Sequence, residues 1–305
     1  MNANSIEVRG VARHYGPVRA VDGVDLAVAH GEVMGLIGHN GAGKTTLFKM
    51  MLGLERPSAG AIKIDGIAVS GPRFRDVRRR VGYMPETTSL YPNLTGLETL
   101  RFFARLKNAD AKQCTTLLAR VGLGHAGARP VRQYSKGMAQ RLLFAQALLG
   151  QPRILFLDEP THGLDPSGVS DFYATLDELR THGVTIVLTS HVLSEVEQRV
   201  DRLALMSAGK LQACGSVQAL REALDLPLAF DVAVRDDAEP DLRAVLTPFA
   251  IEPDIRDGRA RFRCARGAKV GVLAALSGLG QRLLDVTLKE PTLEDVYLGY
   301  RKAAQ

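Results

Sequence analysis

The sequence predicts an α/β protein that carries a small α+β domain at its C-terminal end. Short, continuous apolar runs alternate with helical segments along the first two thirds of the chain, a pattern typical of a parallel sheet covered by helices. After about residue 226, prolines and acidic pairs interrupt short segments of alternating polarity. The length of 305 residues is about twice that of a typical domain, so two domains are expected.

The composition, 46% hydrophobic and 24% charged residues, excludes disordered, collagen-like and disulfide-scaffold proteins. No stretch approaches the roughly 18 to 20 consecutive apolar residues of a membrane-spanning helix. The first residues lack the charged and apolar regions of a secretory signal, so we expect the chain to stay in the cytosol. Cys114, Cys214 and Cys264 lie far apart without CxxC or Cys/His spacing, which predicts neither disulfides nor a zinc or copper site.

The net charge of +6 belongs to residues 1–225, because basic and acidic side chains balance over residues 226–305. The densest basic cluster consists of five arginines, namely Arg73, Arg75, Arg78, Arg79 and Arg80. Nucleic-acid binding needs aromatic side chains among such cations, and few lie nearby. A solvated helix face is the favoured interpretation, with contact to lipid headgroups as the alternative.

The first elements along the chain are strands. Residues 6–11 and 21–28 alternate in polarity, which predicts an antiparallel sheet with one exposed face. The run Val33–Ile37 is apolar throughout and is followed by a glycine-rich turn and helical composition over residues 45–54. This order predicts a buried strand, a turn and a helix.

Residues 95–150 are predicted to be helical. Thr95 and Glu98 have the S/T-x-x-E spacing of a capping box, and further helices are expected over residues 112–121 and 138–149. A stripe of apolar residues at helical spacing, Leu97, Leu100, Phe103 and Ala104, is interpreted as core.

Two buried strands follow, at residues 154–157 and 184–188, with a helix between them at residues 167–180. Segments 230–234 and 259–263 alternate in polarity, as expected for the sheet of the small C-terminal domain.

One motif between a predicted strand and a predicted helix is expected to bind phosphate. It matches G-x-x-x-x-G-K-[ST] and runs through Gly38, His39, Asn40, Gly41, Ala42, Gly43, Lys44, Thr45 and Thr46. Its glycines let backbone N–H groups surround the α- and β-phosphates, Lys44 reaches the β/γ oxygens, and the Thr45 hydroxyl ligates Mg²⁺. A dinucleotide fold is disfavoured, because Thr46 stands where the last glycine of G-x-G-x-x-G belongs.

Asp158 and Glu159 end a predicted central strand, at the edge where open α/β sheets bind ligands. Asp158 is predicted to hold the Mg²⁺ shell, and Glu159 to orient or deprotonate the attacking water. The alternative is a solvated strand end. His191 follows another buried strand and is a candidate partner of the γ-phosphate or the water, or else a structural histidine.

In order and spacing, residues 38–46, 134–138 and 153–159 resemble the nucleotide-binding subunit of ATP-binding-cassette (ABC) transporters, and the resemblance covers roughly residues 5–220. It implies an ABC-type P-loop NTPase fold with a mixed sheet core, an antiparallel β subdomain and a helical subdomain at about residues 88–150. The expected domains are a nucleotide-binding domain, residues 1–225, and an accessory domain, residues 226–305.

The resemblance also implies further site residues. Two copies dimerise head to tail in this family, and the signature of one copy, usually LSGGQ, closes on the γ-phosphate held by the other. The matching residues here are Ser135, Lys136, Gly137 and Met138. Tyr15 matches the aromatic that stacks on adenine, Asp165 the loop that links the two sites, and His191 the switch histidine. The alternatives are a tyrosine that packs on a strand turn and an aspartate that caps a helix.

Three residues depart from the family pattern. Glu86 stands where most members have a glutamine that touches Mg²⁺, and its carboxylate can bind the metal but repels the γ-phosphate. Lys136 replaces a signature glycine, and Met138 replaces the signature glutamine. The chain therefore has an added anion and an added cation close to the expected ATP sites.

The C-terminal segment 289–297 resembles the drug- and lipid-exporting branch of the family. Five segments together resemble the ATPase of the exporter that matures nitrous oxide reductase, and they cover residues 38–40, 84–86, 91–96, 103–107 and 134–138. That resemblance implies a periplasmic copper-handling partner reached through the permease.

The expected function is Mg²⁺-dependent ATP hydrolysis by a homodimer at the cytoplasmic face of the cell membrane, without nucleic acid. The homodimer is expected to drive a separate permease, the exporter that matures nitrous oxide reductase. A generic drug or lipid exporter is one alternative. A cassette protein of ribosomes or DNA is another, disfavoured because the chain has a single phosphate loop and no sustained heptads. A nucleotide sensor that does not hydrolyse is the third, and a phosphate-release assay separates it.

Overall fold

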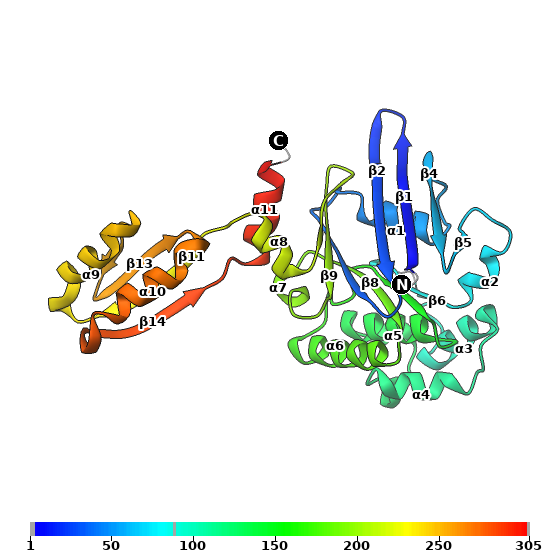
Figure 1. Cartoon of the computed structure of the whole chain (residues 1–305). Coiled ribbons are helices and arrows are strands. Elements are labelled where there is room, and N and C mark those ends of the chain that lie inside the picture. The colour runs from blue at the N-terminus through cyan, green and yellow to red at the C-terminus, as the bar shows by residue number, and fades with distance from the viewer. Residues whose placement is uncertain (1–3, 88–89, 304–305) are drawn as a thin grey trace. The chain divides into compact units, whose positions relative to one another are not determined.

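The structure is a computed structural model that describes residues 4–87 and 90–303 (Figure 1). It divides into two compact units, residues 1–216 and 217–305. The division lies before the predicted boundary at residues 225/226, because helix α8 (Val217–Ala223) packs against helix α11 (Leu293–Ala303) of the second unit. Within the described residues, no helix is both long and apolar enough to cross a bilayer.

An antiparallel sheet opens the first unit, in the order β2-β1-β4-β5. Its strands are β1 (Asn4–Tyr15), β2 (Val18–Ala29), β4 (Ala59–Ile64) and β5 (Ile67–Ala68). Apolar side chains such as Ile6 on β1 and Val24 on β2 are fully buried, while their polar neighbours face solvent. The predicted pair of antiparallel strands is confirmed, and both strands are longer than their apolar cores.

The central sheet of the first unit has six strands in the order β10-β9-β3-β8-β7-β6. Its strands are β3 (Val33–Ile37), β6 (Val81–Met84), β7 (Ile154–Leu157), β8 (Thr185–Ser190), β9 (Arg202–Ser207) and β10 (Lys210–Gly215). All neighbours are parallel except β9 and β10. Every residue of β3, β7 and β8 is buried, which explains the continuous apolar sequences of β3 and β7 and the apolar centre of β8 at residues 186–188.

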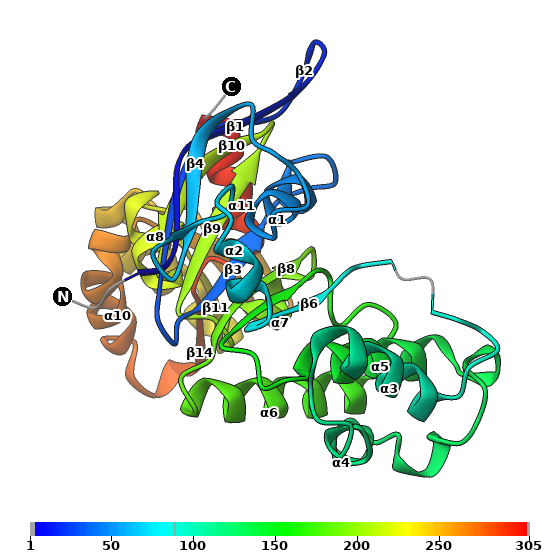
Figure 2. The same cartoon turned by 90° about the vertical axis from the view of Figure 1, so that its right-hand side faces the viewer.

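The helices of the first unit follow the predicted order. They are α1 (Lys44–Met51), α2 (Phe74–Arg78), α3 (Gly96–Lys107), α4 (Gln113–Arg120), α5 (Lys136–Leu148), α6 (Pro166–Thr181) and α7 (Leu193–Val196), with 3₁₀ turns at Gly124–Ala126 and Val131–Gln133. Figure 2 shows α3, α4 and α5 gathered in one group, and these helices contact one another. Residues 88 and 89, where the helical subdomain was predicted to begin, lie outside the described residues.

Local sequence signals set several helix ends. Thr95 Oγ1 accepts the N–H of Glu98 at 3.2 Å, and the Glu98 carboxylate accepts the N–H of Thr95 at 2.9 Å, so the predicted capping box is confirmed. Helix α1 ends before the predicted residue 54, because Gly53 adopts a left-handed φ of +68°. On α2 the arginines are exposed while Phe74 and Val77 are buried, as expected for a solvated helix face.

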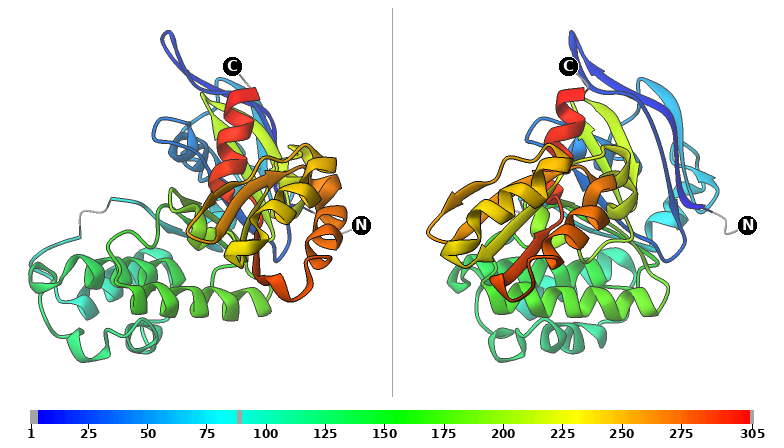
Figure 3. Two further views of the ribbon diagram at one scale, coloured as in Figure 1. Left: turned by 90° about the vertical axis from the view of Figure 1, so that its left-hand side faces the viewer. Right: turned by 60° about the vertical axis from the view of Figure 1, so that its left-hand side comes forward.

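The second unit has its own core and the order βαββαβ, which is a ferredoxin-like arrangement. Its elements are β11 (Leu228–Val234), α9 (Glu239–Leu246), β12 (Asp254–Arg256), β13 (Arg259–Cys264), α10 (Lys269–Ser277) and β14 (Leu283–Lys289), with 3₁₀ turns at Asp236–Ala238, Thr247–Phe249, Arg266–Ala268 and Gly280–Arg282. The sheet is antiparallel in the order β12-β13-β11-β14. Helices α9 (yellow) and α10 (orange) lie against it (Figure 3), so the predicted α+β character is confirmed.

Candidate functional site

The candidate site lies at one edge of the central sheet. Strands β3, β8, β7 and β6 are parallel neighbours, so their carboxyl ends meet there. The predicted phosphate loop follows β3, Asp158 and Glu159 follow β7, His191 follows β8, and Glu86 lies two residues after β6. Groups that are up to about 150 residues apart in the sequence are therefore brought to one edge.

The phosphate loop contains glycines that no other residue can replace. Gly43 has a φ of +101°, and a Cβ atom there would lie 2.3 Å from the carbonyl oxygen of Ala20. A Cβ atom on Gly38 would lie 2.6 Å from the carbonyl oxygen of Met206. Strands β2 and β9 thus approach the loop backbone closely, which these two positions allow only because they are glycines.

Lys44 supplies the positive charge of the loop. The residue is only 6% exposed, and its Nζ donates to the carbonyl oxygens of Gly38 at 2.6 Å and His39 at 3.3 Å. No carboxylate of the described residues forms an ion pair with it. A buried cation whose hydrogen-bond acceptors are neutral carbonyl oxygens is incompletely compensated, so the site suits an anion such as a phosphate.

The other loop residues lie around this cation. His39, Asn40 and Gly41 are exposed at the loop tip, Ala42 is buried, and Thr45 and Thr46 are half-buried on the first turn of α1. The His39 Nδ1 atom lies 2.6 Å from the carbonyl oxygen of Asn40. Exposed residues at the tip and a buried lysine below are suited to a ligand that extends from the protein into solvent.

Thr45 and Asp158 bring two hard oxygen ligands together. The Thr45 hydroxyl donates to Oδ2 of Asp158 at 3.2 Å, and the Thr189 hydroxyl donates to Oδ1 at 2.6 Å. Burial raises the pKa of Asp158, while both hydrogen bonds and Lys44 oppose the rise. Thr189 was not predicted as a site residue. Its polarity at the end of a buried apolar run was the available signal.

These oxygens fit Mg²⁺, which prefers oxygen ligands and usually keeps several waters. Within residues 4–87 and 90–303, no group of three or more His, Cys, Asp or Glu side chains is arranged to hold a metal ion. A hydroxyl and a carboxylate, completed by water and substrate phosphate, form the kind of site that Mg²⁺ uses in phosphoryl transfer.

Glu86 is exposed, and its negative charge is a further cause of the raised pKa of Asp158. We expect Glu86→Gln to keep ATP hydrolysis within about tenfold of the wild-type rate, because the predicted metal ligands Thr45 and Asp158 remain. Steady-state phosphate release checks this. A larger loss would show that the Glu86 carboxylate has a catalytic role of its own.

Glu159 is buried, with 7% exposure, and its carboxylate contacts His191 twice. Oε2 lies 2.7 Å from Nδ1 of His191 and accepts the His191 backbone N–H at 3.3 Å. The His191 ring is about half exposed, so it faces both the carboxylate and the solvent side of the site. This arrangement is suited to a carboxylate base whose orientation is fixed by a histidine.

The predicted signature residues form a second group, at the N-terminal end of α5. Ser135 is the N-cap residue, and its Oγ accepts the N–H of Met138 at 3.1 Å. The methylene groups of Lys136 lie over Gly163, where a Cβ atom would be 2.8 Å from them, and a Cβ atom on Gly137 would be 3.1 Å from the Gly163 oxygen. The signature thus contacts the loop that leads to Asp165.

Asp165 caps helix α6. Its carboxylate accepts the N–H of Gly168 at 3.1 Å and the hydroxyl of Ser167 at 2.9 Å, and these bonds, led by that of Ser167, lower its pKa. The capping alternative is therefore confirmed. A role between two copies remains a prediction.

Tyr15 ends β1 and is 43% exposed, with the guanidinium of Arg13 at 4.7 Å from the centre of its ring. The same hairpin contributes Ala20, which touches Gly43 of the phosphate loop. The hairpin therefore brings an aromatic ring to the loop's side of the molecule. Its stacking on adenine remains a prediction.

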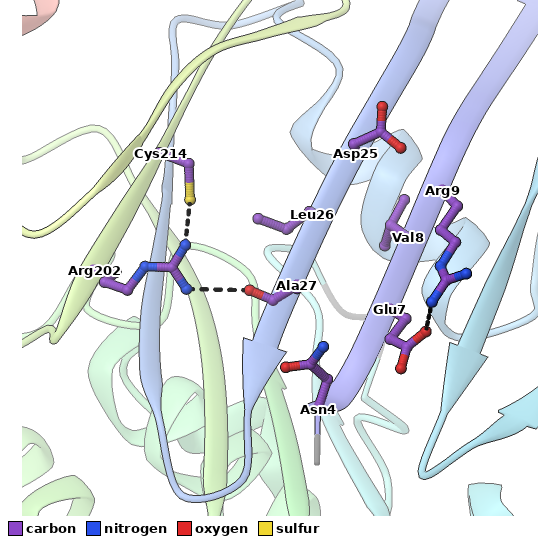
Figure 4. Close-up of a pocket in the computed structure, with 9 residues that line it drawn as sticks. All are labelled: Asn4, Glu7, Val8, Arg9, Asp25, Leu26, Ala27, Arg202 and Cys214. Carbon is purple, nitrogen blue, oxygen red and sulfur yellow. Dashed lines mark hydrogen bonds and ion pairs between the residues drawn. The ribbon is translucent and has the colours of Figure 1, made fainter. Parts of the chain in front are cut away.

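A separate pocket of about 430 Å³ contains none of the predicted site residues (Figure 4). Arg202 lies in it and donates to the carbonyl oxygen of Ala27 at 3.2 Å and to the Cys214 sulfur at 3.1 Å. Burial raises the pKa of the Cys214 thiol. The thiol is protonated at neutral pH and is thus a weak nucleophile and metal ligand.

Comparisons with known proteins show the family to which this chain is similar. The family model described as ABC transporter matches residues 21–162. The daunorubicin resistance ATP-binding protein DrrA3 of Streptomyces coeruleorubidus is 36% identical over 98% of this chain and 96% of its own. The Nod factor export ATP-binding protein I of Cupriavidus metallidurans is 37% identical over 96% of both chains. A solved structure of an ABC transporter ATP-binding subunit has a TM-score of 0.66 at 32% identity, over 72% of this chain and 92% of its own.

Proposed function

Because this chain belongs to the ABC transporter family as an ATP-binding subunit, we propose that it powers an exporter of small organic molecules. The chain is an ABC-type ATPase. The names of the two relatives, which concern daunorubicin resistance and Nod factor export, support an export direction. The observation that carries the ATPase part of the proposal is that Lys44, Thr45, Asp158 and Glu159 lie at one edge of the central sheet.

The residues of the phosphate loop and of the neighbouring strand ends have separate roles in hydrolysis. The N–H groups of the phosphate loop and the ammonium of Lys44 bind the β- and γ-phosphate oxygens, and Tyr15 stacks on the adenine. Thr45 and Asp158 hold Mg²⁺, with Glu86 near them. Bound Mg²⁺ neutralises the charge that develops on the phosphates.

Glu159 is the base in this proposal. Its carboxylate orients the attacking water and accepts its proton, while His191 fixes the carboxylate through Nδ1 and directs its ring toward the γ-phosphate side. Burial excludes bulk water from Glu159, which strengthens these polar interactions. A phosphate loop, a metal-binding pair and a general base in one place are the parts that phosphoryl transfer to water requires.

The signature residues at the N-terminal end of α5 act on the ATP of a neighbouring copy. ABC ATPase subunits work as dimers with a transmembrane permease. We propose a homodimer in which Ser135, Lys136, Gly137 and Met138 of each copy close on the ATP of the other, with Asp165 between the sites. ATP bound between the copies supplies contacts that exist only in the closed state, so binding and hydrolysis alternate the permease between two conformations. In this proposal the dimer acts at the cytoplasmic face of the cell membrane.

Maturation of nitrous oxide reductase is the second candidate function. Its support is the five sequence segments that resemble the ATPase of that exporter, whose permease couples to a periplasmic copper-maturation protein. The names of the relatives above concern other cargo. The three cysteines of this chain are scattered, and the candidate function therefore assigns copper handling to the partner.

Affinity purification of the tagged chain from native membranes, followed by mass spectrometry, tests these functions, with the untagged strain as control. Recovery of a multispanning permease supports the exporter. Recovery of a periplasmic copper-maturation protein as well supports the second candidate. Recovery only from the soluble fraction, with ribosomes or nucleic acid, overturns the exporter and leaves the ATP chemistry intact.

A further inference from the structure

Gln140 joins the signature helix to the catalytic segment of the same chain. It lies on α5 and is only 6% exposed, although its amide is polar. Its Nε2 donates to the carbonyl oxygens of Glu159 at 3.3 Å and of Pro160 at 3.1 Å. A buried amide that bonds two successive carbonyl groups constrains the peptide between them.

The backbone that Gln140 contacts is in a disfavoured conformation. Glu159 has a φ of +48°, which is left-handed and costs about 1 to 2 kcal/mol for a residue with a side chain. It also precedes Pro160, and a residue before proline favours extended backbone. Such a conformation persists only where the surrounding structure holds it.

Hydrogen bonds hold this residue from both sides. The N–H of Glu159 donates to the Thr189 hydroxyl at 2.8 Å, and its carbonyl oxygen accepts from Gln140. The direction of the side chain follows from that backbone, and it brings the carboxylate to 2.7 Å from Nδ1 of His191. If the Gln140 bond is lost, the backbone can relax toward extended φ and turn the carboxylate away.

We propose that Gln140 is a positioning residue for ATP hydrolysis, acting through the left-handed backbone of Glu159. The inference rests on the proposed role of Glu159 as the base. Helix α5 also begins at the predicted signature, with Ser135 as its cap, so one rigid element connects the signature to the backbone of the base. Gln140 is not among the residues proposed to bind phosphate, so its substitution is expected to leave ATP affinity unchanged.

Two substitutions separate positioning from stability. Gln140→Met keeps the length of the side chain and removes its donors, and Gln140→Glu places a carboxylate against two carbonyl oxygens. We expect kcat to fall about 10- to 100-fold while KM and the affinity for ATP stay within about twofold. Gln146→Met and Gln146→Glu, at a half-buried position on the same helix, are the matched controls and keep kcat within about twofold.

A double-substitution experiment tests the route of the effect. In single-turnover hydrolysis, Gln140→Met is expected to add less than about twofold to the loss caused by Glu159→Gln, because both act on one group. The inference would be overturned if the loss in the double variant equalled the product of the two single losses. A Gln140→Met variant with wild-type kcat would also overturn it. ATP binding confirms that each variant is folded. A wild-type protein that binds ATP without hydrolysing it would instead overturn the proposed function.

Discussion

Glu159→Gln is expected to lower ATP hydrolysis at least about 100-fold while ATP binding is retained, because the amide cannot accept the proton of the attacking water. The substitution is nearly isosteric, and the Gln140 and Thr189 bonds to the backbone of residue 159 do not involve the carboxylate. Single-turnover phosphate release measures the loss. Unchanged binding of ATP places the defect in the chemical step.

The same variant is expected to trap the closed dimer, since ATP stays between the two copies. Size-exclusion chromatography with ATP and Mg²⁺ should show a dimer for Glu159→Gln and mostly monomer for the wild type after turnover. Glu178→Gln, which removes only an exposed ion pair with Arg120, is the control and behaves like the wild type. Hydrolysis at the wild-type rate in Glu159→Gln would remove this residue from the role of base.

Lys44→Met has the second-largest expected effect, a weakening of ATP affinity by about 10- to 100-fold. The buried ammonium donates charge-assisted hydrogen bonds to phosphate, each worth about 1.5 to 3 kcal/mol, and methionine keeps the side-chain length without the charge. Titration with ATP by calorimetry measures the affinity. Thermal denaturation gives a second readout, because a ligand that binds only the folded state raises Tm.

Lys49→Met is the matched control, since Lys49 is an exposed lysine on the same helix. ATP should raise the Tm of the wild type and of Lys49→Met by similar amounts and raise that of Lys44→Met much less. Wild-type affinity in Lys44→Met would show that Lys44 does not contact the phosphates.

Local sequence patterns predicted the elements of the fold that lie at the site. Val33–Ile37 and Ile154–Leu157 are apolar at every position because both faces of a central parallel strand are covered, and both form strands where expected. The spacing of Thr95 and Glu98 fixed one helix start. The glycine spacing of the phosphate loop placed it correctly between β3 and α1.

Other features depended on the tertiary structure. The left-handed backbone of Glu159 precedes a proline, and no local rule predicts it. The hydrogen bond that this residue accepts from Gln140 and the one that it donates to Thr189 were not predicted either. Asp165 is an intermediate case, because helix capping was one of two interpretations of the sequence and the structure confirmed it through the N–H of Gly168.

The sequence by itself determined the phosphate loop, the acidic strand end and the alternation of strands and helices, because these signals lie within about ten neighbouring residues and report local geometry. Only the tertiary structure decided which side chains surround Glu159, where the two units divide and that the second unit is ferredoxin-like. The physical reason is that these contacts join residues far apart in the sequence. Their meeting depends on strand order and helix packing, which local periodicity does not encode.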